Sequence, residues 1–154
     1  MAYSEEYIKM CNCRDLQYRW VPKQCDYFTP IKEMELDAFT LVDYGYTDYR
    51  GGYRTGPIII PGRVYCIKDA SEPFVRKHKK ELVWLPSLEQ LVDMLPNNYK
   101  WNCSYDGKLY CVKAGDASIC SKDVRIAFLQ VAMARVFGLC WMNDEWIVIS
   151  ERRL

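Results

Sequence analysis

The stretch from Ser121 to Gly138, SKDVRIAFLQVAMARVFG, carries the clearest secondary-structure signal in the chain. Its apolar residues recur at helical spacing over a wide face, which predicts a helix buried against more than one neighbour. Ser121 is expected to cap this helix, Asp123 to lie in its first turn, and Gly138 to take the left-handed position after its end. The apolar face consists of Val124, Ile126, Ala127, Phe128, Leu129, Val131, Ala132, Met133 and Phe137.

A β-hairpin is predicted before this helix. Two strand-like runs, Tyr99–Tyr105 and Lys108–Lys113, flank the dipeptide Asp106-Gly107. This dipeptide favours a tight type I′ turn, because glycine accepts a positive φ. Such a turn makes Cys103 and Cys111 candidate cross-strand neighbours.

Short elements are predicted on both sides of this pair. After the helix, Leu139–Met142 and Glu145–Ser150 are expected to form a small hairpin around Asn143-Asp144. Before the hairpin, Ser87 and Gln90 have the spacing of a capping box, which predicts a helix ending at Pro96.

The N-terminal half shows a helical pattern followed by short β patterns. Ser4 is expected to cap a first helix that runs to about Trp20 and stops before Pro22. The pattern of Ser71–Glu81 does not decide its secondary structure, although Ser71, Glu72 and Pro73 suit the start of a short helix. The strand-like runs are 38–43, 45–50, 58–60, 63–68 and 82–85. The pattern predicts an α+β fold, an antiparallel sheet with about three helices packed on one face.

Length and composition favour one globular domain. The chain has 154 residues, which matches a single domain over 1–154, with a tyrosine-rich hairpin insertion at about 43–56. Its 21 Lys and Arg nearly balance 20 Asp and Glu, so the overall basic excess typical of nucleic-acid binders is not visible. No apolar run approaches the length of a membrane span, and no signal peptide is recognisable, so we expect a cytoplasmic protein.

The eight cysteines are expected to stay reduced. Several of them occupy apolar segments of a chain that is long enough to form a core, and free thiols in such positions act as small hydrophobic groups. Cys11-x-Cys13 is too tightly spaced for a zinc knuckle, so no metal site is predicted.

No catalytic motif or cofactor-binding fingerprint is recognisable. The single histidine, His78, lies within a run of Lys and Arg and is read as a surface residue rather than a catalytic base. Loop carboxylates such as Asp43, Asp48, Asp144 and Glu145 have no spacing that selects them for catalysis. We therefore predict that the chain is not an enzyme and that it uses no cofactor.

The most unusual segment is the tyrosine-rich stretch from Asp43 to Gly56. Gly51-Gly52 suits a two-residue hairpin turn, which would gather tyrosine and arginine side chains at a tip. Tyr and Arg are enriched in binding hot spots, and they also stack on exposed bases. A hairpin packed on its own sheet is the alternative interpretation. The candidate binding residues are Tyr44, Tyr46, Tyr49, Arg50, Tyr53 and Arg54, with Arg76, Lys77, Lys79 and Lys80 as a second, basic group.

Two segments resemble a known group of proteins. Trp84-Leu85-Pro86 with Gln90-Leu91, and Phe137-Gly138 followed by Trp141 and Trp146, are similar to motifs of small proteins encoded by bacteriophages and prophages of Gram-positive bacteria. The opening of those proteins resembles the region through Trp20-Val21-Pro22 and Cys25, where they commonly have glycine at the position of Cys25. They often carry a histidine in the last helix, where this chain has Ala134 or a neighbour. The group has no assigned activity, so the resemblance implies origin more than mechanism.

These observations lead to three functional hypotheses. The first is a non-enzymatic phage accessory protein that binds a host protein, with host defence systems as frequent targets of such proteins. The second is a nucleic-acid-binding or virion-associated module that stacks Tyr and Arg on bases. The third is an enzyme built from scattered carboxylates and tyrosines, which a deep polar pocket would support. The first is preferred, and the oligomeric state stays open.

Overall fold

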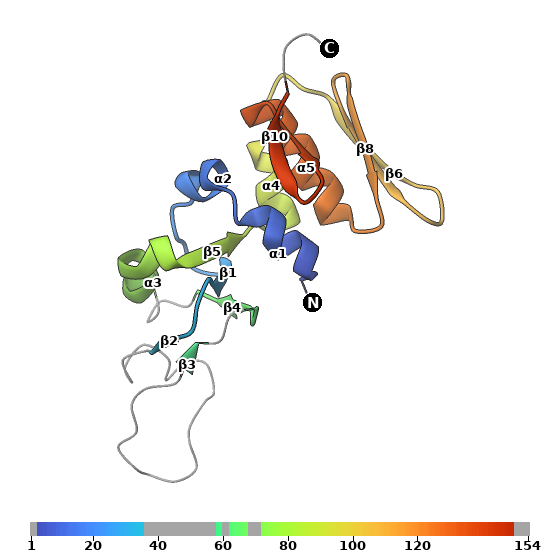
Figure 1. The fold of residues 1–154 in the computed structure, drawn as a ribbon. Coiled ribbons are helices and arrows are strands. Elements are labelled where there is room, and N and C mark those ends of the chain that lie inside the picture. Colours follow the sequence, from blue (N-terminus) through green and yellow to red (C-terminus); the bar gives the residue numbers. More distant parts are fainter. Residues whose placement is uncertain (1–2, 36–57, 60–61, 68–71, 150–154) are drawn as a thin grey trace. The chain divides into compact units, whose positions relative to one another are not determined.

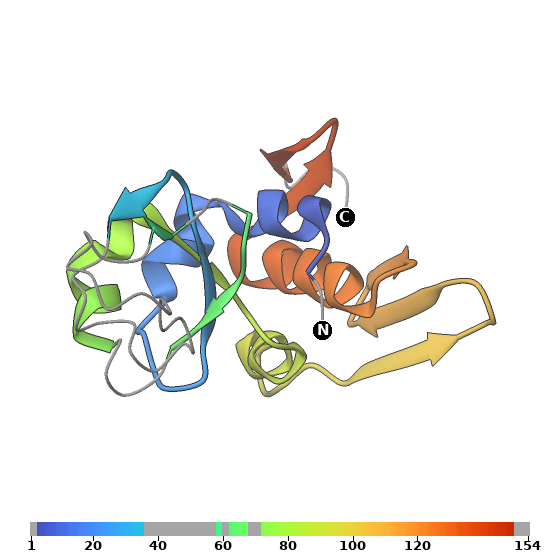
Figure 2. The same ribbon diagram turned by 90° about the horizontal axis from the view of Figure 1, so that it is seen from below.

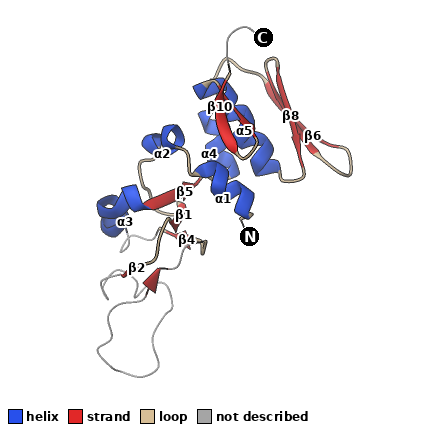
Figure 3. Ribbon diagram, viewed as in Figure 1, coloured by secondary structure: helices blue, strands red, loops and turns tan. Residues whose placement is uncertain are grey.

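The computed structural model describes residues 3–35, 58–59, 62–67 and 72–149 (Figure 1). Helices and antiparallel strands follow one another along the chain, which confirms the α+β class (Figure 3). The chain divides into two compact units: unit 1 comprises Met1–Asn12 and Gln17–Leu85, and unit 2 comprises Cys13–Leu16 and Pro86–Leu154. The single-domain organisation over 1–154 stays a prediction.

Unit 1 contains two small sheets. In the larger, β1 (Tyr27–Pro30) lies between β4 (Tyr65–Cys66) and β5 (Leu82–Leu85), with antiparallel pairing on both sides. In the smaller, β2 (Met34–Glu35) pairs with β3 (Ile58–Ile59). Over the whole described part of the chain, the strands form four small sheets rather than the one sheet we expected.

The helices of the N-terminal region differ from the expected single helix to Trp20. The structure has α1 (Glu5–Cys11) and α2 (Arg14–Arg19), separated at Asn12. Ser4 caps α1 as predicted, since its Oγ accepts the Tyr7 N–H at 3.2 Å. Asn12 ends α1 because its backbone leaves the helical region, with φ −74° and ψ 53°. Asparagine favours such a helix end over a helix interior.

The segment 71–81 forms a helix followed by a tighter turn. α3 spans Glu72–His78, and a 3₁₀ turn over Lys79–Glu81 leads into β5. All four residues of β5 are buried, so the helix and turn carry the chain from the surface into the core of unit 1.

Gln17 closes the outer edge of β5. Its Nε2 donates to the carbonyl of Trp84 at 3.1 Å, and its Oε1 accepts the Trp84 N–H at 2.8 Å. The same Nε2 donates to the carbonyl of Cys11 at 2.7 Å. Because an uncovered strand edge is a template for unwanted pairing, this amide serves as an edge cap.

Unit 2 is built around α5 (Val124–Phe137), which packs against α4 (Leu88–Met94). It also packs against the strands β7 (Tyr110–Ala114), β8 (Ala117–Ser121) and β9 (Leu139–Met142). Gly138 takes the predicted left-handed conformation, with φ 65°. The N-cap is Asp123 rather than Ser121, because the Asp123 carboxylate accepts the Arg125 N–H at 2.8 Å. Ser121 instead accepts the N–H of Asp123, one step earlier.

Seven of the nine residues predicted for the apolar face are buried, and Val124 and Phe137, at its two ends, are only partly buried. The capping box of α4 is confirmed in both directions: Ser87 Oγ accepts the Gln90 N–H, and Gln90 Oε1 accepts the Ser87 N–H.

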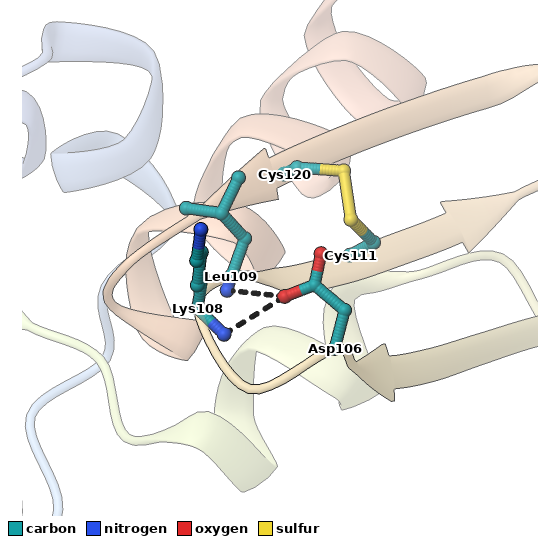
Figure 4. Close-up of a disulfide and its surroundings, with 5 residues drawn as sticks. All are labelled: Asp106, Lys108, Leu109, Cys111 and Cys120. Carbon is teal, nitrogen blue, oxygen red and sulfur yellow. Dashed lines mark hydrogen bonds between the residues drawn. A yellow bond between two sulfur atoms is a disulfide. The ribbon is translucent and has the colours of Figure 1, made fainter.

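Three strands form the largest sheet of unit 2, in the order β6 (Trp101–Tyr105), β7 (Tyr110–Ala114), β8 (Ala117–Ser121). The turn between β6 and β7 has four residues, because Tyr105 lies opposite Tyr110, so the expected two-residue type I′ turn at Asp106-Gly107 is wrong. The Asp106 carboxylate accepts the N–H groups of Lys108 and Leu109, both at 2.8 Å (Figure 4). A side chain that bonds the backbone in this way stabilises a wider turn.

The β7–β8 register brings Cys111 opposite Cys120, and the two form a disulfide (Figure 4). The expectation that all eight cysteines stay reduced is therefore wrong for this pair, whereas the other six are free. Cys103 lies opposite Val112, not opposite Cys111. Gly115-Asp116 is the two-residue loop that sets this register, and its glycine has φ 62°.

Arg135 holds that loop onto α5. Its Nε donates to the Ala114 carbonyl at 3.0 Å, its guanidinium pairs with the Asp116 carboxylate, and it lies 5.2 Å from the centre of the Tyr99 ring. A Cβ at Gly115 would come within 3.0 Å of Tyr99, so the contact requires glycine.

The chain ends in the predicted hairpin of β9 (Leu139–Met142) and β10 (Glu145–Val148). Asn143 and Asp144 have φ of 51° and 66°, as a type I′ turn requires. The aromatic rings of Trp141 and Trp146, directly opposite each other, pack edge to face at 5.1 Å. Of the helices that the structure describes, none has both the length and the apolar character needed to cross a membrane.

Candidate interaction surface

The two groups of predicted binding residues have different outcomes. The tyrosine-rich group, with Tyr44, Tyr46, Tyr49, Arg50, Tyr53 and Arg54, lies outside the described residues. The basic group is described, and it spans the end of α3 and the 3₁₀ turn that follows.

The basic residues are not uniformly solvated. Arg76 bonds Glu72 through its Nε at 2.9 Å and its Nη2 at 2.6 Å, and the same Nη2 donates to the carbonyl of Pro22 at 3.3 Å. Lys79 donates through Nζ to the carbonyl of Trp20. Lys77 and Lys80 are exposed. Arg76 and Lys79 thus clamp the segment from Trp20 to Pro22 by hydrogen bonds to its carbonyls, whereas Lys77 and Lys80 face solvent.

His78 is held between neighbours on the same segment. Its ring stacks on Phe74 with centroids 4.5 Å apart, and its Nδ1 lies 3.6 Å from Glu81 Oε1. His78 is therefore half-buried at the helix end, whereas the sequence had suggested a fully exposed residue.

The clamped segment starts from a buried tryptophan. Trp20 is 1% exposed, its ring lies parallel to that of Trp84, and its Nε1 donates to Asp26 Oδ2 at 2.9 Å. The same carboxylate oxygen accepts the Lys23 N–H at 3.0 Å. A buried carboxylate with several donors fixes the loop around it, since leaving it unpaired would be costly. The loop over Trp20–Asp26 is therefore rigid.

This loop presents the apolar side chain of Val21 to solvent. Val21 is 60% exposed although the residues on either side of it are clamped through their carbonyls, and Tyr18, at the end of α2, is 86% exposed. Lys23 follows as an exposed cation. We define the Val21 surface as the set Tyr18, Val21, Lys23, Arg76 and Lys79.

Sequence reasoning missed the apolar part of this surface. Trp20-Val21-Pro22 was visible as a motif, and a residue before proline is biased toward an extended conformation. Nothing in the pattern tells which of Trp20 and Val21 is buried, because that depends on the distant Trp84 and Asp26.

The charges of the Val21 surface are partly engaged within the unit. Asp26 is buried and accepts hydrogen bonds, Arg76 is paired with Glu72, and Lys79 bonds the Trp20 carbonyl, whereas Lys23 is an exposed cation. Exposed apolar groups with a cationic rim are typical of a binding surface rather than of a reaction centre.

Within the described part of the chain, no group of three or more His, Cys, Asp or Glu side chains could hold a metal ion. No protein-family model, curated protein or solved structure matches the chain.

Proposed function

We propose that this chain is a non-enzymatic accessory protein of a bacteriophage or prophage, and that it acts by binding a host protein through the Val21 surface. A component of a host defence system is the target class that the phage resemblance suggests. The positive φ of Cys25, 70°, supports that resemblance, because the similar proteins commonly have glycine there.

The observation that carries the proposal is the exposed Val21 on a loop with a locked backbone. Arg76 and Lys79 hold the carbonyls beside it, and the Asp26 carboxylate holds Trp20 and Lys23. Binding to a preordered loop loses little conformational entropy, so the apolar contact contributes more of its free energy to affinity.

The chemistry of the surface specifies the partner. Val21 and Tyr18 suit a shallow apolar recess, and the exposed Lys23 suits a carboxylate at its rim. We expect the tyrosine and arginine side chains of 44–54 to add a second contact to the same host protein.

The proposed location is the host cytoplasm, where disulfides are rare. The Cys111–Cys120 disulfide is compatible with this location because the two residues are already paired through the β7–β8 ladder. Reduction would leave the backbone hydrogen bonds of that ladder in place.

The proposal is tested by affinity purification from host lysate with Val21→Glu as the variant. Glutamate at this position places a negative charge among the carboxylates of the partner, so recovery of the partner should fall at least about tenfold. Val148→Glu is the matched control, because Val148 is 73% exposed and lies in unit 2. It should recover the partner as the unchanged protein does.

Two outcomes would contradict the proposal. Equal loss with both variants would show that the Val21 surface is not the contact. Binding of single-stranded nucleic acid that weakens steeply with salt would favour the nucleic-acid hypothesis instead, because phosphate contacts release counterions. The double variant Tyr49→Ala/Arg50→Ala tests the second contact separately.

A further inference from the structure

Within the part of the chain that the structure describes, β6 is an unprotected edge strand. Among the described residues it pairs only with β7 (Figure 2). All five of its side chains are exposed. Its sequence, WNCSY, contains no charge and no proline, the two devices that commonly protect a strand edge. The edge of β5 differs, because the Gln17 amide caps it.

The sheet register shows which backbone groups of β6 are open. The Cα atoms of Cys111 and Cys120 lie 4.1 Å apart, as in a non-hydrogen-bonded pair, so the backbone groups of Cys111 face β6. Ser104, opposite Cys111, therefore bonds to β7. Because successive residues of a strand face opposite edges, the N–H and C=O groups of Trp101, Cys103 and Tyr105 point to the free edge.

The side chains of these three residues share one face of the sheet. Trp101 packs edge to face on Phe128 of α5 at 5.3 Å, and Tyr105 stacks on Tyr110 at 4.6 Å. Trp101 is still 44% exposed and Tyr105 is 57% exposed. The strand thus offers aromatic side chains and unpaired backbone groups side by side.

The order of residues in β6 is symmetric about its centre. An aromatic residue stands at each end, a small polar residue comes next on each side, and Cys103 is in the middle. A two-fold interface needs a surface that is complementary to itself, and this pattern meets the requirement. We propose that two copies of the chain pair antiparallel along β6, with Cys103 facing Cys103 of the second copy.

The pairing satisfies both the backbone and the side chains. Trp101 would lie opposite Tyr105 of the other copy, Asn102 opposite its Ser104, and about six backbone hydrogen bonds would form between the outward-facing groups. No two like charges meet. The aromatic pairs would cover the surface that each copy leaves exposed.

The helices leave room for this arrangement. α5 packs mainly on β7 and β8, and it reaches β6 through the contact of Phe128 with Trp101. Strands of one sheet are about 4.8 Å apart, so the two copies of β7 would be about 14 Å apart. That exceeds the roughly 10 Å at which packed helices touch, so the two copies of α5 do not collide. β8, the other edge, is only partly exposed and runs directly into Lys122 and α5.

Sedimentation equilibrium of the full-length chain over a range of concentrations tests the pairing. The unchanged protein should form dimers, and Cys103→Lys should raise the dimer dissociation constant at least about tenfold, because two lysines would meet at the symmetry axis. Asn102→Lys is the matched control. It adds the same charge to the same strand but places it opposite Ser104, so it should dimerise almost normally.

A thiol-to-thiol cross-linker with a short spacer provides a second measurement that needs no substitution. Mass spectrometry of the unchanged dimer should find Cys103 linked to Cys103 of the other copy. This result would support the pairing even if Cys103→Lys does not fold. A chain that stays monomeric, a dimer cross-linked only through other cysteines, or a monomer that adds a strand from a host protein at β6 would overturn it.

Discussion

The side-chain amide of Gln17 pairs with the backbone of Trp84 as a residue of a neighbouring strand would, accepting its N–H and donating to its carbonyl. Trp84 is buried, and its ring lies parallel to Trp20 under the Val21 surface. A single glutamine therefore supports both the sheet edge of unit 1 and the loop that we propose as the binding site.

Replacing Gln17 should destabilise the protein. Gln17→Met keeps the length of the side chain but leaves the Trp84 N–H and carbonyl without their partner, so the free energy of unfolding should fall by about 2–4 kcal/mol. Urea unfolding followed by tryptophan fluorescence measures this change. Gln24→Met, at an exposed turn position, is the control and should change stability by less than about 0.5 kcal/mol. Equal effects of the two variants would contradict the role of Gln17.

Cys25 should tolerate glycine better than a branched residue. Its φ of 70° lies in the left-handed region, and its side chain is exposed, so the side chain adds strain and little packing. We expect Cys25→Gly to leave stability unchanged or to raise it by up to about 1 kcal/mol, and Cys25→Val to lower it by about 1–2 kcal/mol. Thermal unfolding of both variants checks the order, and a valine variant as stable as the glycine variant would contradict it.

The disulfide should protect Cys111 and Cys120 from alkylation and leave the other six cysteines reactive. Alkylation of the denatured, unreduced protein should modify the six free cysteines and spare Cys111 and Cys120. Their double replacement by serine should lower the free energy of unfolding by no more than about 3 kcal/mol, because the loop that the bond closes is short. Modification of all eight cysteines would contradict the assignment.

Asp106 should titrate below the usual range of an aspartate. Hydrogen bonds from the Leu109 and Lys108 N–H groups lower the pKa of its carboxyl group in the folded state. A lowered pKa stabilises the fold above the unfolded-state value and loses this contribution as pH falls through the folded-state value. NMR titration of the Asp106 carboxyl carbon measures the shift. Asp106→Asn should be less stable than the unchanged protein near neutral pH, and the difference should shrink as the pH falls through the folded-state pKa of Asp106.

Local signals predicted most of the elements. Ser87 with Gln90, Asn143-Asp144 and Gly138 each act within a few residues, and each is where the sequence indicated. The α+β class followed from these elements. One further signal was overlooked: Gly115-Asp116 is a two-residue hairpin loop, and counting outward from it places Cys111 opposite Cys120.

Features that depend on distant residues were not predictable. The break between α1 and α2 follows from the geometry of Asn12, and Gln17, just beyond it, bonds a strand 67 residues away. The exposure of Val21 depends on two hydrogen bonds from distant residues. Arg76, in α3, donates to the Pro22 carbonyl, and Lys79, in the turn after α3, donates to the Trp20 carbonyl. The basic run was visible in the sequence, but its division into clamping and exposed cations was not.

The two units are not separate, continuous stretches of the sequence. Cys13–Leu16 belongs with the C-terminal unit, although the residues on both sides of it belong with the N-terminal one. A recombination event at the boundary between Leu85 and Pro86 would therefore separate four codons from the rest of their unit.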